Sequence, residues 1–177
     1  MDSEKEKRSE LTTLDRENVI KVLELVDESV RLGKHPFAAI VVGVDGQLVC
    51  SATNNSLPPD GDPTNHAELV AASMSFRKIA AEGRDPIKML STATLYTSAE
   101  PCAMCAGAIY WCGIGRVIYV LSEQKLRQLT GNHPENPTLD LPCRQVFKTG
   151  MRSVCVIGPL DEFQEEATRP HLTFWKS

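Results

Sequence analysis

The chain has 177 residues, of which 42% are hydrophobic and 24% are charged, and its formal net charge is −4 at pH 7. The length and apolar content predict one globular domain with a substantial core. This small negative net charge argues against a large nucleic-acid-binding surface, because such surfaces are usually basic. No apolar run approaches the roughly 20 residues of a membrane-spanning helix, so we expect no membrane partner.

The cysteine pattern and the N-terminus indicate the compartment. The six cysteines lack the spacing of a secreted disulfide scaffold. The first ten residues are charged and polar and contain no recognisable signal peptide. We therefore expect a reducing, cytoplasmic environment, with residues 1–13 as a flexible tail and residues 14–177 as a single domain.

The first half of the chain predicts a helix and then a hairpin. Apolar residues recur at helical spacing over residues 14–32, and Gly33 is expected to end that helix. Strand character over residues 37–44 is followed by Asp45-Gly46, a hairpin signal, and by a returning strand at 47–52. The sheet should therefore begin with an antiparallel pair.

The remaining elements predict an α/β fold. We expect helices at 65–81, 102–111, 143–148 and 161–167, a helix from the cap Ser122 to residue 129, and strands at 92–97, 116–121 and 153–157. From residue 92 onward strands alternate with helices, which implies parallel crossovers and a layered sheet. Residues 132–142 contain three prolines and little periodicity, so both a lid and a plain surface loop remain open. The terminal Phe174-Trp175 pair is expected to dock on a core or on a partner.

Two short motifs carry the chemistry. His66-Ala67-Glu68 precedes Pro101-Cys102-Ala103-Met104-Cys105 by about one helix, one loop and one strand. One imidazole and two thiols suit Zn²⁺ and leave the fourth tetrahedral position free for water, as in a catalytic site. Glu68 can reach that water without being a ligand. His-x-Glu followed by Pro-Cys-x-x-Cys is the signature of zinc-dependent deaminases.

Other interpretations of the cysteine pair are weaker. A Cys-x-x-Cys pair also occurs in redox modules and as half of a structural zinc ribbon. A redox pair would not need the upstream His-x-Glu. Glu68 could also be an acid that stabilises a helix start, a role compatible with catalysis. A ribbon would need a second closely spaced pair, which is absent among the other cysteines, Cys50, Cys112, Cys143 and Cys155.

The chain resembles the cytidine deaminase superfamily, and within it the small branch of guanine, cytosine and tRNA-adenosine deaminases. The resemblance covers roughly residues 14–129. It rests on Pro36-Phe37-Ala38-Ala39, on Asn55 ahead of Asp62-Pro63-Thr64, on His66-Ala67-Glu68 and on the run 97–111. Within that run, Gly-Ala-Ile-Tyr-Trp after the second cysteine is most similar to bacterial guanine deaminases.

The resemblance implies a fold, a cofactor and roles for several residues. It implies a three-layer α/β/α sandwich around a five-stranded mixed sheet, often as a homodimer. It assigns His66, Cys102 and Cys105 to zinc and Glu68 to proton transfer. The candidate substrate-binding residues are Asn55 and Phe37, together with Asn65 and Ala67, which flank the zinc histidine.

The substrate that the resemblance favours is a free nucleobase, with guanine, converted to xanthine and ammonia, as the first expectation. Cytosine, isocytosine-type rings, a nucleoside, or tRNA adenosine remain alternatives, and so does a non-catalytic zinc-bearing subunit. The chain departs from the family pattern at His35, Asn65 and Ala99, where glycine, a small residue and cysteine are usual. These departures leave the metal chemistry intact but affect which ring fits.

Overall fold

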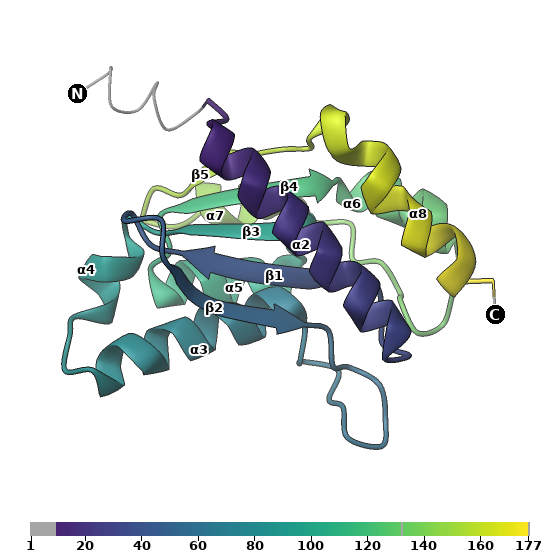
Figure 1. Ribbon diagram of the computed structural model, residues 1–177, viewed down its shortest axis with the longest axis horizontal. Coiled ribbons are helices and arrows are strands. Elements are labelled where there is room, and N and C mark those ends of the chain that lie inside the picture. The colour runs from purple at the N-terminus through teal and green to yellow at the C-terminus, as the bar shows by residue number, and fades with distance from the viewer. Residues whose placement is uncertain (1–9, 132, 177) are drawn as a thin grey trace.

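The computed structural model describes residues 10–131 and 133–176, and it confirms the α/β fold with three layers (Figure 1). The central sheet has five strands in the order β2-β1-β3-β4-β5. Strand β1 (Ala38–Val42) runs antiparallel to β2 (Leu48–Thr53) and to β3 (Thr94–Ala99). Strands β4 (Arg116–Leu121) and β5 (Cys155–Ile157) continue the sheet in parallel from β3, as the alternation of strands and helices predicted.

The first helix, α2 (Thr13–Arg31), begins at a capping box. The Thr12 hydroxyl accepts a hydrogen bond from the backbone N–H of Asp15, and the Asp15 carboxylate accepts one from the backbone N–H of Thr12. Leu11 packs on the same apolar cluster as the buried face of α2. Residues 10–13 of the expected tail are therefore in contact with the domain, whereas residues 1–9 lie outside the described part of the chain.

Helices cover both faces of the sheet (Figure 1). Helices α2, α6 (Glu123–Thr130) and α8 (Gln164–Phe174) pack on one face, against a cluster that includes Ile40 and Ile118. The sheet alternates side chains between its faces, so the neighbouring residues face the second layer. That layer consists of α3 (Ala67–Ala81), α4 (Pro86–Leu90), α5 (Ala103–Cys112) and α7 (Cys143–Lys148).

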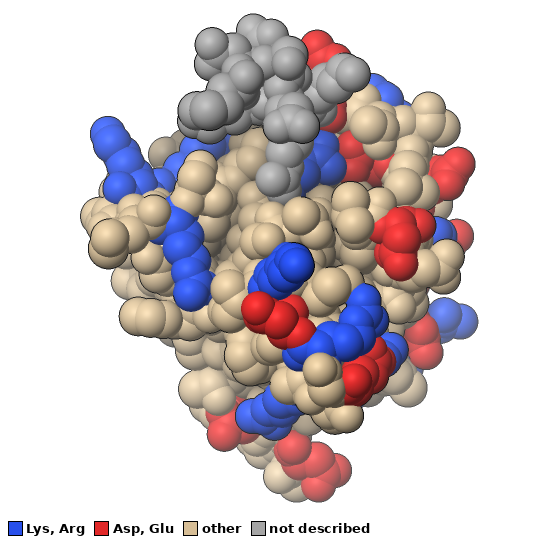
Figure 2. Space-filling model, turned by 90° about the vertical axis from the view of Figure 1, so that its left-hand side faces the viewer, with Lys and Arg blue, Asp and Glu red and all other residues tan. Residues whose placement is uncertain are grey.

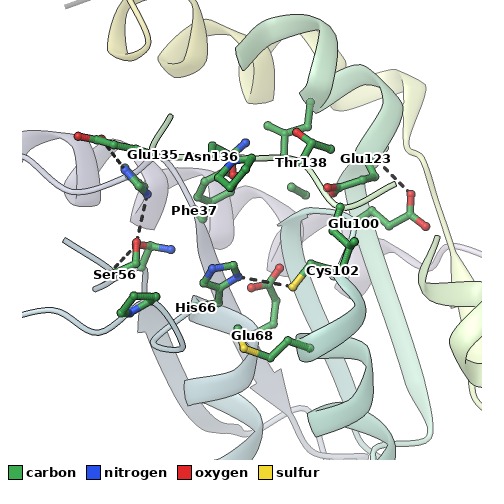
Figure 3. A pocket seen from close by; sticks show the side chains of 18 of the residues that line it. Phe37, Ser56, His66, Glu68, Glu100, Cys102, Glu123, Glu135, Asn136 and Thr138 are labelled. Carbon is green, nitrogen blue, oxygen red and sulfur yellow. Dashed lines mark hydrogen bonds and ion pairs between the residues drawn. The ribbon is translucent and has the colours of Figure 1, made fainter. Parts of the chain in front are cut away.

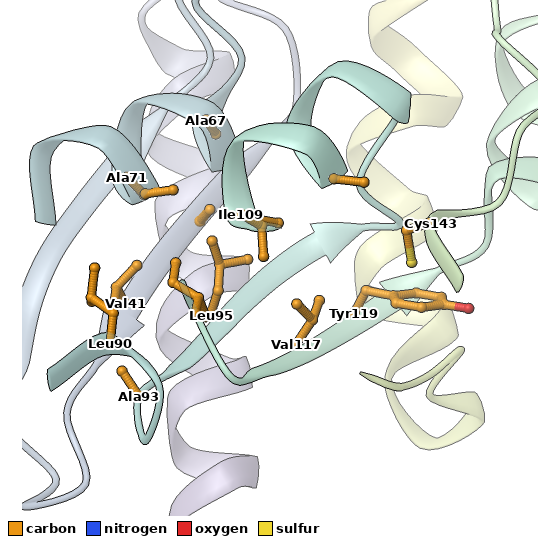
Figure 4. Close-up of a cluster of buried hydrophobic side chains, with 14 of the residues drawn as sticks. Val41, Ala67, Ala71, Leu90, Ala93, Leu95, Ile109, Val117, Tyr119 and Cys143 are labelled. Carbon is orange, nitrogen blue, oxygen red and sulfur yellow. The ribbon is translucent and has the colours of Figure 1, made fainter. Parts of the chain in front are cut away.

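The second cluster of buried residues lies under α3 and α5 (Figure 4). Val41, Leu95 and Val117 come from three neighbouring strands and are fully buried against Ala71 of α3 and Ile109 of α5. Small alanines on α3 let this helix approach the sheet closely. The N-termini of α3 and α5, which carry the two motifs, therefore lie beside one another at the C-terminal end of β3.

The structure differs from the sequence prediction at two helices. Helix α4 was not predicted, because its five residues are too few to show periodicity; Asp85 caps it and Pro86 occupies its first turn. Helix α8 follows a short 3₁₀ turn, η1 (Asp161–Phe163), and continues to Phe174 instead of ending at residue 167. The buried residues Pro170 and His171 lie in this extension, so tertiary packing outweighs the helix-breaking tendency of proline.

The other helix and strand ends agree with the expected bounds to within one or two residues, and β4 and α7 have the expected bounds. Among the described residues, no helix combines the length and apolar character needed to cross a membrane.

Candidate metal centre and substrate cavity

Three side chains at the starts of two helices form a candidate metal centre (Figure 3). His66 is the last extended residue before α3, and Cys102 is the last extended residue before α5. Cys105 follows in the first turn of α5 and is buried. One ligand atom from each of the three residues lies within 4.8 Å of the others, and Cys102 Sγ lies 3.6 Å from His66 Nδ1.

This arrangement fits a tetrahedral zinc ion. Bonds of about 2.3 Å to sulfur and about 2.0 Å to nitrogen require ligand atoms roughly 3.5–3.8 Å apart. The observed separation between Cys102 Sγ and His66 Nδ1 lies in that range. The N-terminal ends of α3 and α5 also favour negative charge, which helps a thiolate form there. The three residues thus bring together ligands of the right chemistry, all within 4.8 Å of one another.

The cysteine thiols differ in their acidity. Hydrogen bonding from Cys105, and then from His66, lowers the pKa of Cys102 to about 4, although burial acts in the opposite direction. The same contact with Cys102, followed by burial, raises the pKa of Cys105. Cys102 is therefore ionised at neutral pH even before a cation contributes its charge.

Glu68 lies in the first turn of α3, with its carboxylate beside the three ligands. One carboxylate oxygen lies 3.6 Å from Cys105 Sγ, and the other accepts a hydrogen bond of 3.2 Å from the Thr97 hydroxyl. Glu68 is only 5% exposed. Burial, reinforced by the negative charge of Cys102, raises the pKa of Glu68 to about 7. A carboxylate with such a pKa is suited to take up and return a proton near neutral pH.

His66, Glu68 and Cys102 form the floor of a cavity of about 480 Å³ (Figure 3), and the buried Cys105 lies behind them. The walls of the cavity come from the loop before β1, the loop after β2, the end of β3 with the first turn of α5, helix α6, and residues 134–139 between α6 and α7. The volume lies within the range of small-molecule sites in proteins. The six residues 134–139 thus form part of the cavity wall and are not a remote surface loop.

The four predicted substrate contacts occupy different places. Phe37 lines the cavity. Asn55 is not among the described residues that line the cavity, and its side-chain amide donates to the backbone oxygen of Asp60. Its neighbour Asn54 is buried and lines the cavity instead. Asn65 also lies outside the lining, and Ala67 is fully buried in the core.

Two acidic residues on the cavity wall were not predicted. The buried carboxylate of Glu100 accepts hydrogen bonds from the backbone N–H of Glu123 at 3.1 Å and of Cys143 at 3.0 Å, which fixes the starts of α6 and α7. Burial, and then the charge of Cys102, raises the pKa of Glu123 to about 8. The sequence signal for Glu100 was an acid directly after a buried strand, but its partners are 23 and 43 residues away.

The C-terminal aromatic pair docks behind the cavity. The Trp175 indole N–H donates to His171 Nδ1 at 2.9 Å, and Trp175 is 7% exposed. Its ring also contacts the rings of Phe37 and His133, with centroid separations of 6.3 and 5.2 Å. The end of the chain therefore supports the cavity wall from outside.

Known proteins share both the motifs and the fold. Residues 13–121 match the family model of the cytidine and deoxycytidylate deaminase zinc-binding region. A probable cytosine deaminase of Schizosaccharomyces pombe is 38% identical over 167 residues, covering 94% of this chain and 96% of the relative. The guanine deaminase of Bacillus subtilis is 39% identical over 84 residues, about half of each chain.

A solved structure agrees in architecture. The guanine deaminase from Nitrosomonas europaea superposes with a TM-score of 0.70 at 24% identity, covering 96% of this chain and 88% of that chain. At this identity the likeness supports the fold alone. The matched region, 13–121, contains the three candidate ligands and Glu68. On these grounds the chain belongs to the cytidine and deoxycytidylate deaminase family.

Proposed function

We propose that this protein is a zinc-dependent hydrolase that removes the exocyclic amine of a small nucleobase and releases ammonia. The observation that carries the proposal is that His66, Cys102 and Cys105 converge beside the buried carboxylate of Glu68. Of these residues, His66, Cys102 and Glu68 line the floor of the cavity. A zinc ion held by the three ligands supplies hydroxide near neutral pH.

Glu68 has the position and the acidity for the proton transfers. Its carboxylate takes a proton from the attacking water and delivers it to a ring nitrogen, and a second proton goes to the departing amine. The products are then the ring carbonyl and ammonia, so that the atoms of one water are fully used. The Thr97 hydroxyl, 3.2 Å from one carboxylate oxygen, holds the carboxylate in place between these transfers.

Cytosine is the first candidate ring. The relative that matches nearly the whole chain is a probable cytosine deaminase, and that match includes the region after residue 129, which the sequence resemblance did not cover. This ordering differs from the sequence expectation, which placed guanine first on the basis of residues 107–111. Guanine is the second candidate, supported by the shorter match to the Bacillus subtilis enzyme and by a cavity large enough for a fused ring.

A tRNA substrate receives little support from the charged residues. On the face shown in Figure 2, lysines and arginines are interspersed with acids. Arg144 donates to the Tyr119 hydroxyl and to backbone carbonyls, Arg152 donates to the carbonyls of Tyr110 and Trp111, and Arg127 pairs with Asp140. We therefore propose a small-molecule partner and no nucleic acid.

We further propose a homodimer. Trp111 on α5 is 74% exposed and is therefore not part of the core. A large aromatic side chain in water is typical of an interaction surface. Sedimentation velocity should give a species of twice the chain mass, and Trp111→Glu should shift it to the monomer.

The proposal is tested by ammonia release from the purified zinc-loaded protein. The panel contains cytosine, isocytosine, guanine, adenine, cytidine, guanosine, adenosine and an anticodon stem-loop RNA. We expect one base to react, and Glu68→Gln to abolish turnover while retaining one zinc per chain. Glu166→Gln, an exposed acid on α8, is the control and should react like the wild type. Activity retained in Glu68→Gln, or silence across the panel with zinc bound, would overturn the proposal.

A further inference from the structure

Residues 133–139, which include the cavity-wall residues 134–139, contact the loop before β1 through the carboxylate of Glu135. Glu135 Oε2 lies 3.0 Å from His35 Nε2 (Figure 3). The Glu135 side chain is 46% exposed, whereas that of His35 is 5% exposed. His35 lies in the loop before β1, one hundred residues earlier in the chain. This contact therefore joins two cavity walls that the backbone does not connect.

His35 is itself held from its other ring nitrogen. The Ser56 hydroxyl lies 3.2 Å from His35 Nδ1 and 2.7 Å from the side-chain oxygen of Asn54. The contacts Glu135–His35–Ser56–Asn54 thus run along one side of the cavity and link residues 133–139 to the loop after β2 (Figure 3). Because the rings of Phe174 and Trp175 pack on the His35 ring, the imidazole has a fixed orientation.

The same wall carries polar atoms that the protein does not satisfy. Asn136 Nδ2 and Thr138 Oγ1 are shielded from solvent and have no hydrogen-bonding partner among the described residues. Both residues line the cavity, on either side of Pro137. Buried polar groups in native proteins usually have partners. Two such groups in one short segment point to a polar ligand that completes the wall.

We infer that His35 and Glu135 are positioning residues that hold residues 133–139 closed over the cavity, so that Asn136 and Thr138 contact the ring of the substrate. This inference rests on the proposed function for the identity of the ligand, but the closure itself does not. His35 stands where the family resemblance expects glycine, and glycine could not make this contact. The contact that closes the wall is therefore not expected in family members that have glycine at this position.

The closure is tested by hydrogen exchange of the zinc-loaded protein without ligand. In the wild type the backbone N–H of Asn136 donates to the carbonyl of His133 at 3.0 Å, which gives a protected amide to follow. Glu135→Ala should speed exchange in the peptide covering residues 133–139 roughly tenfold, because it removes a charge-assisted contact. Glu135→Gln keeps an oxygen that accepts from the imidazole N–H and should restore most of the protection.

Asp140→Ala is the matched control. Asp140 is an acid between α6 and α7 that pairs with Arg127 at the surface, both side chains being more than half exposed, and it does not line the cavity. Its removal should leave the exchange of residues 133–139 unchanged. Equal exchange in the wild type and in Glu135→Ala would overturn the inference whatever the protein binds.

The effect on the ligand is tested separately, with cytosine and guanine as probes. Binding is measured by calorimetry to the zinc-loaded Glu68→Gln protein, with and without Glu135→Ala, and steady-state kinetics are measured in the active background. We expect Glu135→Ala to weaken binding roughly tenfold and to act on KM more than on kcat. Faster exchange with unchanged binding and KM would contradict the positioning role. A wild-type protein that binds neither base contradicts the proposed function, while the exchange result still decides the closure.

Discussion

Arg116 of β4 and Asp15 of α2 form a buried, bidentate ion pair. Arg116 Nη1 lies 2.7 Å from Asp15 Oδ1, and Nη2 lies 3.0 Å from Oδ2. The Tyr96 hydroxyl donates to the same carboxylate at 2.7 Å, and Arg116 also donates to the carbonyl of Glu10. The pair thus fixes the start of α2 against the centre of the sheet and holds the residues that precede it.

Asp15→Ala should destabilise the protein strongly. It would leave the buried Arg116 guanidinium without its counter-charge and remove the acid of the capping box, at a cost of about 3–5 kcal/mol. Asp27→Ala is the control, because Asp27 pairs with Arg169 at 3.3 Å while both side chains are more than half exposed. Its loss should cost less than about 1 kcal/mol. Urea unfolding of the zinc-loaded variants measures both; similar losses would contradict the importance of the buried pair.

His171 should make stability fall in mild acid. Burial, with a contribution from His35, lowers the pKa of His171 from its usual 6.5 to about 4. Below pH 6.5 the unfolded chain therefore binds a proton that the folded chain does not, so stability is full above pH 6.5 and decreases as the pH falls towards 4. The integrated loss is roughly 3 kcal/mol.

His171→Asn isolates this contribution. Asparagine can still accept the Trp175 indole hydrogen bond, but it does not titrate. The difference in unfolding free energy between wild type and variant should therefore change by about the same roughly 3 kcal/mol between pH 7 and pH 4. Two parallel stability curves across this range would show that His171 is not the group responsible.

Removal of one thiol ligand should remove the metal and loosen the helix pair. Cys102→Ala should lower the bound zinc from one ion per chain to well below half, and reduce the melting temperature, since metal-binding energy contributes to folding. Cys50→Ala, a half-buried cysteine on β2, is the matched control and should keep both. Atomic absorption and calorimetric melting provide the readouts. Full zinc content in Cys102→Ala would remove this cysteine from the ligand set.

Glu100→Gln should be destabilising although the shapes of the two side chains are alike. The carboxylate accepts one backbone N–H on each oxygen, from Glu123 and from Cys143, whereas an amide offers one oxygen and places a donor against the second N–H. The expected loss is about 1–3 kcal/mol. Glu165→Gln, exposed on α8, should change the unfolding free energy by less than about 0.5 kcal/mol. Equal unfolding midpoints for the two variants would indicate that the Glu100 contacts are dispensable.

Local patterns were sufficient to predict most of the fold. Strand β4 and helix α7 have the predicted bounds because each lies between clear breaks in the apolar pattern. Helix α4 was not predicted because its five residues are too few to show apolar periodicity, and Asp85 and Pro86 are equally common in a loop that follows a helix. The extension of α8 was not predicted because Pro170 and His171 are buried by residues that are distant in the sequence, and a local sequence pattern does not include those residues.

The candidate site likewise has one part that the sequence predicts and one part that it does not. His66, Glu68, Cys102 and Cys105 form two compact motifs, and the structure brings them together as their spacing suggested. Asn55 was predicted to face the substrate, but Asn54 lines the cavity, because the conformation after β2 decides which of two adjacent side chains turns inward. The contact of His35 with Glu135 joins loops one hundred residues apart, a separation at which a single sequence carries no pairing signal.

The chemistry and the selecting wall occupy separate stretches of the chain. The candidate ligands and Glu68 all lie between residues 66 and 105, whereas residues 133–139 and Trp175 belong to its last third. Glu100 joins the two stretches, because its carboxylate accepts from the first residues of α6 and α7, but residues 134–139 themselves contribute none of the candidate ligands. A new ring preference can therefore arise in evolution, or be installed by grafting the segment between α6 and α7 from another family member, while the hydrolytic apparatus is inherited unchanged.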